Sequence, residues 1–291
     1  MGSRTSETWT RGVTVITGGA GGMGSACAEH FAQRGPVLLT DCSEAALQAT
    51  VERLQAEGHE ASGVVCDITD ASAVQELADA VASKGELSAL VHTAGISPSM
   101  TEDPRRVLEV NLVATAHLLD AFYWLATVGS ACVCIASISG YRVVPPGTEP
   151  LLLQPLRSDF FEALDELAAV GNNTRLAYAL SKYGVKLLCQ RRAREWGARG
   201  ARLCSLSPGG IMTGMGKLER NRGSRGLVEN TALGRRGSPH EIASVIDFLC
   251  GPGASYITGV DIIVDGGVVA GYLHHASTDF REAWLDASRL D

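Results

Sequence analysis

Residues 13–24 read VTVITGGAGGMG and join an apolar, β-rich run to a glycine-rich turn. A stretch of helical character follows, from about Ser25 to Gln33. Glycines suit a tight turn and let the backbone approach a pyrophosphate without interference from Cβ atoms. The N-terminus of the following helix offers free N–H groups and a positive dipole end to the phosphates. This order of strand, glycine turn and helix predicts a dinucleotide site near the start of the chain.

The rest of the chain alternates apolar runs with helix-length segments, which is typical of repeated βαβ units and a parallel sheet. Several runs are continuously apolar, which suits strands that helices cover on both faces. The sequence therefore predicts an α/β fold with one doubly wound parallel sheet of the Rossmann type. The expected strands lie at residues 12–17, 36–41, 62–66, 88–92, 131–136, 201–206 and 260–264.

A single domain is expected, because 291 residues can bury one large core. We expect a polar leader at 1–10, the Rossmann-type domain at 11–270 and a C-terminal extension at 271–291 that contains Trp284. An insertion at about 145–173 interrupts the βαβ rhythm and has turn residues at both ends. Apolar residues at helical spacing within 159–170 predict a short amphipathic helix there.

The amino-acid composition argues against several classes of protein. Hydrophobic residues make up 45% and charged residues 20% of the chain, the balance of a folded globular protein. The net charge of -7 and the lack of a basic cluster argue against a nucleic-acid partner. The eight cysteines show no Cys-x-x-Cys spacing, so we expect no metal and mostly buried thiols in a reducing cytoplasm. No apolar stretch is long enough to cross a bilayer, so no membrane partner is expected.

Two aspartates follow predicted strands and bear on the cofactor. Asp41 ends the second strand, where a carboxylate can accept hydrogen bonds from the adenosine ribose hydroxyls. The same carboxylate repels a 2′-phosphate, and no nearby Arg or Lys neutralises one, so NAD is expected rather than NADP. Asp67 follows the third strand and could bind the adenine amino group or cap the next helix.

Tyr178 and Lys182 are four positions apart, which places both side chains on one face of a helix. A nearby ammonium favours the ionised phenol, so Tyr178 could serve as an acid or a base near neutral pH. A tyrosine and a lysine at this spacing are usually surface residues. The pair therefore predicts a catalytic function only in combination with the motifs around it.

These motifs together resemble the short-chain dehydrogenase/reductase family. The resemblance covers most of the chain and rests on Thr17-Gly18-x-x-x-Gly22-x-Gly24, Ala94-Gly95, Asn111, Ser137, Tyr178-x-x-x-Lys182, Pro208-Gly209-x-x-x-Thr213 and Asp265-Gly266-Gly267. It implies that Tyr178 transfers a proton between enzyme and substrate, and that Lys182 holds the nicotinamide ribose and lowers the pKa of the phenol. It also implies that Ser137 polarises the substrate oxygen and that Asn111 holds a relay water.

The resemblance extends to the cofactor contacts. The residues expected to contact NAD are Gly18, Gly22, Met23, Gly24, Asp41, Asp67, Ile68, Ala94, Gly95, Tyr178, Lys182, Ile211 and Thr213. Thr213 would bind the nicotinamide carboxamide, or it would simply cap a helix. His92 stands where the family often has Asn, and we expect it to support the sheet in the core rather than act as a base.

The flanks of Tyr178 at 176–182 and the sequence GRRG at 234–237 resemble the bacterial 3α-hydroxysteroid dehydrogenase/carbonyl reductase branch of this family. This resemblance implies a bulky apolar alcohol or ketone of steroid, terpenoid or polyketide type. The insertion is expected to alter either a pocket wall or a subunit contact. A homodimer or homotetramer is expected.

Two other functions remain open on the sequence. Epimerases and dehydratases that retain NAD share the Tyr-Lys pair, and Gly21 also satisfies their glycine spacing. Asn111 and the segment 208–213 favour the dehydrogenase instead. An NAD-sensing binding module is the third possibility, although the presence of both Tyr178 and Ser137 argues against it.

Overall fold

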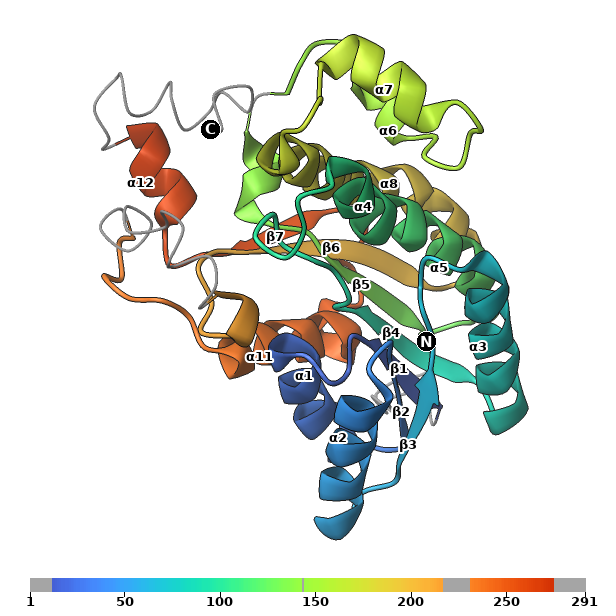
Figure 1. The fold of residues 1–291 in the computed structure, drawn as a ribbon. Coiled ribbons are helices and arrows are strands. Elements are labelled where there is room, and N and C mark those ends of the chain that lie inside the picture. The colour runs from blue at the N-terminus through green and yellow to red at the C-terminus, as the bar shows by residue number, and fades with distance from the viewer. Residues whose placement is uncertain (1–11, 143, 217–230, 275–291) are drawn as a thin grey trace, which may run out of the picture.

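The computed structural model describes residues 12–142, 144–216 and 231–274. Within these residues seven strands form one parallel sheet in the order β3-β2-β1-β4-β5-β6-β7 (Figure 1). The strands are β1 (Val13–Thr17), β2 (Val37–Asp41), β3 (Ala61–Val65), β4 (Leu87–His92), β5 (Ala131–Ile135), β6 (Arg202–Pro208) and β7 (Asp261–Val264). Every strand end lies within two residues of its predicted position. The predicted doubly wound α/β fold is confirmed.

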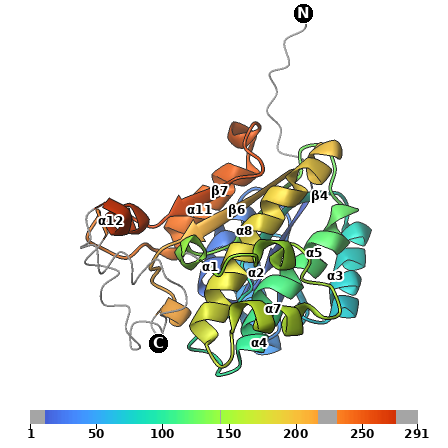
Figure 2. The ribbon, with the colours of Figure 1, turned by 90° about the horizontal axis from the view of Figure 1, so that it is seen from above.

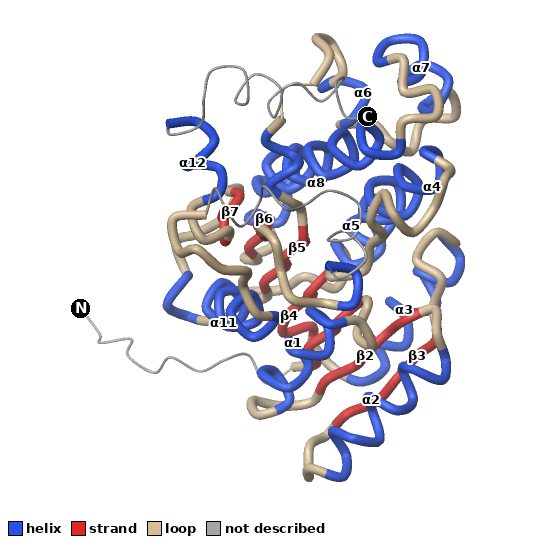
Figure 3. Tube along the Cα trace, turned by 60° about the vertical axis from the view of Figure 1, so that its left-hand side comes forward, coloured by secondary structure: helices blue, strands red, loops and turns tan. Residues whose placement is uncertain are grey.

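Helices cover both faces of the sheet, as Figures 1 and 3 show. One face carries α1 (Gly22–Ala32), α2 (Glu44–Ala56) and α11 (Pro239–Cys250), whose apolar sides bury residues such as Phe31 and Ile246. The other face carries α3 (Ala71–Lys84), α5 (Ala114–Tyr123) and α8 (Thr174–Ala198), with Phe122 and Trp196 in its core. This two-sided cover explains why β1, β4 and β5 are buried along their whole length.

The insertion before α8 lies on the outer side of α8 and of α4 (Pro104–Leu108) in Figure 1. It contains α6 (Glu149–Leu152) and α7 (Phe160–Ala168), and α7 falls within the helix predicted at 159–170. Phe160 and Leu164 are buried in the same core as α8. Arg105 of α4 pairs with Glu162 of α7 at 2.6 Å. The insertion is therefore part of the packed domain, while the short helix α6 was not predicted.

The C-terminal part of the described chain contains η3 (Pro252–Ala254) and α12 (Val268–His274). Figure 2 places α12 beyond the β7 edge of the sheet. This helix runs across the domain boundary expected at residue 270. The predicted leader at 1–10 and the extension from 275 onward, with Trp284, lie outside the described residues. None of the helices in the described ranges is long and apolar enough to cross a membrane.

Candidate active site

The glycine turn lies between β1 and α1, at the point where the strand order reverses between β1 and β4. Gly18 has a φ of 66°, and a Cβ atom there would lie 2.8 Å from main-chain atoms of Ala94. A Cβ atom on Gly24 would collide with the carbonyl of Gly18. Only glycine fits at both positions. The turn therefore brings bare backbone to the crevice where doubly wound sheets bind nucleotides.

Asp41 ties the end of β2 to this turn. Its Oδ2 accepts a hydrogen bond from the Ala20 N–H at 3.2 Å, and its Oδ1 accepts one from the Ser43 N–H at 3.1 Å. The side chain is half-buried, and each carboxylate oxygen has a second lone pair. The carboxylate therefore lies beside the glycine turn, at the position where a dinucleotide presents its adenosine ribose.

The segment after β6 packs against the glycine turn at Gly22. A Cβ atom on Gly22 would lie 2.9 Å from Cγ2 of Thr213, so the two residues are in close contact. Ile211 is 8% exposed and forms an isolated parallel bridge with Gly237. Thr213 Oγ1 accepts from the Gly216 N–H at 3.0 Å, which is the capping arrangement. The structure therefore brings the two predicted cofactor segments together, although they are nearly 200 residues apart.

The predicted helix-capping role of Asp67 is wrong. The N-cap of α3 is Asp70, whose carboxylate accepts from the N–H groups of Ser72 and Ala73. Asp67 instead stabilises the preceding turn by accepting from the N–H and hydroxyl of Thr69, and these bonds lower its pKa. The adenine contact expected of Asp67 stays a prediction.

Two other predicted cofactor contacts face inward. The side chain of Ile68 is 7% exposed and lies in the core, so a cofactor contact there would involve its main chain. Met23 is half-buried in the first turn of α1 and packs against the core between α1 and the sheet.

Lys182 is buried near the Tyr178 ring, one helical turn further along α8. Its Nζ donates to the carbonyl of Ile135 at 2.9 Å and lies 5.8 Å from the centroid of the Tyr178 ring. Only 4% of Lys182 is exposed, and burial lowers its pKa to about 8. An ammonium in this position favours phenolate over phenol in its neighbour. The half-buried Tyr178 is therefore a candidate for proton exchange.

Asn111 is held in a π-helical segment, η1 (Glu109–Val113), between α4 and α5. Its Oδ1 accepts from the Ile96 N–H at 2.9 Å, and its Nδ2 donates to the Ile96 carbonyl and to Ser181 Oγ. A Cβ atom on Gly95 would lie 2.9 Å from Asn111 Oδ1 and 3.4 Å from Lys182 Nζ. The crowding explains the glycine and shows that Gly95, Asn111 and Lys182 meet at one place. Widened helical turns of this kind often occur at functional sites.

A chain of buried hydrogen bonds joins β1 to Asn111 through His92. Thr115 Oγ1 donates to the Asn111 carbonyl at 2.8 Å, so it must accept from His92 Nε2, which lies at 2.9 Å. His92 Nδ1 then accepts from Thr17 Oγ1 at 2.7 Å. Burial lowers the pKa of His92 to about 4, so the ring is neutral. His92 lies in the core as expected, and its environment does not suit a general base.

Ser137 lies between β5 and the short helix η2 (Ile138–Tyr141). Its Oγ accepts from the Ser139 N–H at 3.2 Å, which leaves the hydroxyl hydrogen to donate elsewhere. A Cβ atom on Gly140 would lie 2.9 Å from main-chain atoms of Lys182 and Tyr183. The turn that carries Ser137 therefore rests directly on the helix that carries Tyr178 and Lys182.

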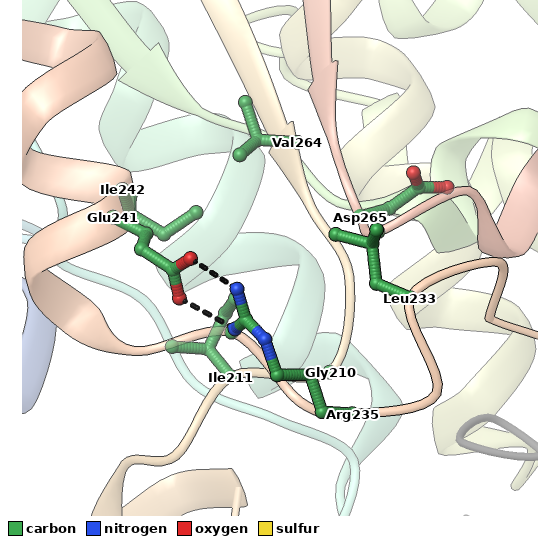
Figure 4. A pocket seen from close by; sticks show the side chains of 10 residues that line it. Gly210, Ile211, Leu233, Arg235, Glu241, Ile242, Val264 and Asp265 are labelled. Atoms are coloured by element: carbon green, nitrogen blue, oxygen red, sulfur yellow. Dashed lines mark hydrogen bonds and ion pairs between the residues drawn. The ribbon is translucent and has the colours of Figure 1, made fainter.

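A hollow beside this site lies between the loop after β6, the end of β7 and the start of α11 (Figure 4). Arg235 and Glu241 form a two-point ion pair in it, with N–O distances of 2.9 and 2.7 Å. Asp265 accepts from the N–H groups of Gly267 and Val269. Arg235, Glu241 and Asp265 already have partners for their charges. They therefore stabilise the loops around the hollow, including the one that carries Ile211, and are not obvious ligand-binding groups.

The donor set fits a nicotinamide dinucleotide. The glycine turn leaves room for a pyrophosphate at the N-terminus of α1, and Asp41 offers lone pairs beside it. Gly95, Thr213 and Lys182 would surround the nicotinamide ribose and carboxamide at the same edge of the sheet. The bound group would donate or accept the hydride, and the side chains would handle the proton.

Sequence reasoning missed three contributors to this arrangement. The Ile135 carbonyl that holds Lys182 is a main-chain group and leaves no signal in the sequence. Thr115 lies four residues after Asn111, and helical threonines often bond to the carbonyl four residues back, so this contact could have been found. Lys186, buried one turn beyond Lys182, looks in the sequence like an ordinary surface lysine.

Comparison with known proteins agrees with this geometry. The family model described as short chain dehydrogenase matches residues 12–148, and one described as Enoyl-(Acyl carrier protein) reductase matches residues 164–269. The residues between the two matches lie within the predicted insertion. The model matches thus cover most of the domain on either side of it.

Individual proteins resemble the chain along most of their length. Short-chain dehydrogenase/reductase bsc3 of Alternaria brassicicola is 33% identical over 271 residues, which span 88% of this chain and 96% of that protein. The 3-alpha-hydroxysteroid dehydrogenase/carbonyl reductase of Comamonas testosteroni is 33% identical over 253 residues, 80% of this chain and 96% of that protein. The crystal structure of gox2181 superposes with a TM-score of 0.72 at 29% identity, covering 89% of this chain and 96% of that one. This chain belongs to the short-chain dehydrogenase/reductase family, whose oxidoreductases interconvert hydroxyl and carbonyl groups with a nicotinamide dinucleotide.

Proposed function

We propose that the protein is an NAD-dependent oxidoreductase that interconverts a secondary alcohol and a ketone, with Tyr178 as the acid or base. The observation that carries the proposal is the buried Lys182 ammonium, which the Ile135 carbonyl holds beneath the Tyr178 ring. Burying an ammonium costs several kcal/mol that one hydrogen bond to a carbonyl does not fully offset, so the buried charge indicates a function. Stabilising a phenolate in Tyr178 is such a function.

In ketone reduction, bound NADH would supply the hydride, and side chains of the protein bind the substrate oxygen and transfer its proton. The Ser137 hydroxyl donates to the substrate carbonyl, where negative charge grows. The Tyr178 hydroxyl gives its proton to the same oxygen, and Lys182 stabilises the phenolate that remains. In alcohol oxidation the same groups act in reverse.

The proton then passes between Tyr178 and solvent. We assign Asn111 to this path through its main chain, because its side-chain amide is already bonded to Ile96 and Ser181. The Asn111 carbonyl, which accepts from the Thr115 hydroxyl, would hold the relay water.

Asp41 supports NAD over NADP. Its carboxylate accepts two main-chain N–H bonds, which hold it beside the glycine turn. A 2′-phosphate at that place would meet this negative charge. We expect NADH to bind at least about 10-fold more tightly than NADPH, and Asp41→Ser to remove most of this preference. Fluorescence quenching titrations measure both affinities, and equal affinities in the unmodified protein would contradict the role of Asp41.

The substrate is proposed to be bulky and apolar, of steroid, terpenoid or polyketide type. Ile138, directly after Ser137, packs with Val268, Val269 and Tyr272 of α12. The chain next to Ser137 is therefore packed among apolar side chains, which favours an apolar substrate over a highly polar one. The 33% identity to the Comamonas testosteroni enzyme points the same way. We also propose that the protein acts in the cytoplasm as a homodimer or homotetramer, without nucleic-acid or membrane partners.

One experiment separates this function from an epimerase or dehydratase that retains NAD. The purified protein is tested for bound NAD and for oxidation of added NADH by dihydrotestosterone, camphor, acetophenone and cyclohexanone. The proposal predicts little retained NAD and fastest NADH oxidation with one of the larger ketones. Tightly retained NAD with no net oxidation would contradict the proposed reaction, and a preference for cyclohexanone would contradict the proposed substrate size.

A further inference from the structure

A second, partly buried polar cluster lies outside the catalytic set, between η2, α8, β6 and β7. Lys186 of α8 is 7% exposed, and its Nζ donates to the Gly140 carbonyl at 3.0 Å. The same Nζ lies 3.1 Å from the centroid of the Tyr141 ring. The Tyr141 hydroxyl donates to Asp261 Oδ2 at 2.5 Å, and Ser205 Oγ donates to Asp261 Oδ1 at 2.6 Å. An ammonium, an aromatic face and a carboxylate thus form one connected network.

Burying the Lys186 ammonium in this network costs free energy that an apolar side chain at position 186 would avoid. Burial lowers the pKa of Lys186 to about 8, which reports that its charged form is disfavoured there. Burial, together with the bond to Asp261, raises the pKa of Tyr141, so its hydroxyl stays protonated and donates. A methionine or leucine at position 186 would fill the space without this penalty. The lysine therefore calls for an explanation other than packing.

All of these contacts converge on η2. Gly140 rests on the main chain of Lys182 and Tyr183, and Lys186 fixes the Gly140 carbonyl from the next turn of α8. Tyr141 anchors the other end of η2 to β7 through Asp261. Ser137 is the N-cap of η2, so a shift of this four-residue helix moves the Ser137 hydroxyl with it.

We propose that Lys186, together with Tyr141 and Asp261, is a positioning residue that fixes the Ser137 hydroxyl relative to Tyr178. None of the three is assigned contact with substrate or cofactor. These three residues hold η2 in place, and Ser137 itself donates to the substrate. The inference rests on the proposed role of Ser137 as the donor to the substrate oxygen. A donor displaced by about 1 Å loses up to about 100-fold in rate, so modest movement of η2 is enough to matter.

The test compares Lys186→Met in two backgrounds, the unmodified protein and Ser137→Ala. Single-turnover reduction of the fastest ketone in the panel above, with enzyme in excess over NADH, measures even slow rates. We expect Lys186→Met to lower the rate about 10-fold in the unmodified protein and less than about twofold in the Ser137→Ala background. The affinity for NADH should stay within about twofold, because the network does not reach the glycine turn. Arg191→Met, which removes an exposed cation from the same helix, should change neither quantity.

Each result bears on the proposal. An equal loss of rate in both backgrounds, or a lower melting temperature with an unchanged rate, would overturn it. Lys186→Arg, which keeps a donor, should recover part of the rate and thereby support it. If Lys186→Met does not fold, Tyr141→Phe replaces it in the same comparison, since it removes only the bond to Asp261. A normal rate for Ser137→Ala alone would instead contradict the proposed function, and it would remove the basis of this inference as well.

Discussion

Lowering the pH should destabilise the protein through His92. This ring is 2% exposed, and burial lowers its pKa from 6.5 to about 4. Between these two values the unfolded chain binds a proton that the folded protein excludes, so unfolding becomes more favourable as the pH falls. Each pH unit below 6.5 removes about 1.4 kcal/mol until the pH reaches the folded pKa. At pH 5 the loss from His92 alone is about 2 kcal/mol, and below pH 4 it levels off at about 3 kcal/mol.

The perturbation that isolates this effect is His92→Gln. Glutamine does not titrate, yet it offers one acceptor for Thr17 and one donor for Thr115, the two bonds that the histidine forms. The free energy of unfolding is measured by urea denaturation at pH 8 and pH 5, followed by tryptophan fluorescence, to which the buried Trp196 contributes. We expect the decrease between the two pH values to be smaller by about 2 kcal/mol in His92→Gln than in the unmodified protein.

A further variant completes this test. His92→Leu removes both hydrogen-bonding partners and should lower the stability at pH 8 by about 2 to 4 kcal/mol. The same pH dependence in His92→Gln and in the unmodified protein would refute the assignment of a buried, neutral ring.

Three glycine and core positions give further predictions. Gly18→Ala places a methyl group at a φ of 66° and in contact with the loop after β4, so we expect a loss of about 2 to 3 kcal/mol in urea denaturation and weaker NADH quenching. Gly95→Ala brings a methyl group to 2.9 Å from Asn111 Oδ1 and 3.4 Å from Lys182 Nζ, so kcat should fall about 100-fold, and an unchanged kcat would contradict this crowding. Phe160→Ala in the insertion should cost about 3 to 5 kcal/mol of unfolding free energy, whereas a surface appendage would lose almost nothing.

The sequence was sufficient for those parts of the fold that depend on local patterns. Continuous apolar runs identify β1, β4 and β5, because strands covered on both faces need apolar side chains on both sides. The glycine turn was also recognisable, since its backbone conformation excludes other residues. Helix boundaries were harder to predict: Asp67 and Asp70 are both plausible caps, and only the path of the chain shows that α3 begins after Asp70.

The sequence indicates candidate site residues one at a time, but it does not show how they come together in space. The contact of Gly22 with Thr213 and the meeting of Gly95, Asn111 and Lys182 depend on strand order, which joins distant segments. The amphipathic pattern of 159–170 predicted a helix, yet the pattern has no information on which surface it covers. The role of Lys186 was hidden for a similar reason, because its partners Tyr141 and Asp261 come from other elements.

In the proposed reaction Tyr178 carries the proton while NADH carries the hydride. Deuterium-labelled NADH and the best ketone of the panel are incubated with the unmodified protein and with Tyr178→Phe, and the deuterium in the alcohol product is measured by mass spectrometry. Phenylalanine keeps the ring above Lys182 and removes only the hydroxyl. We expect NADH affinity within about twofold of the unmodified protein and a rate of label transfer lower by at least about 100-fold, the usual contribution of a positioned acid or base. Label transfer at a near-normal rate in Tyr178→Phe would contradict the assignment.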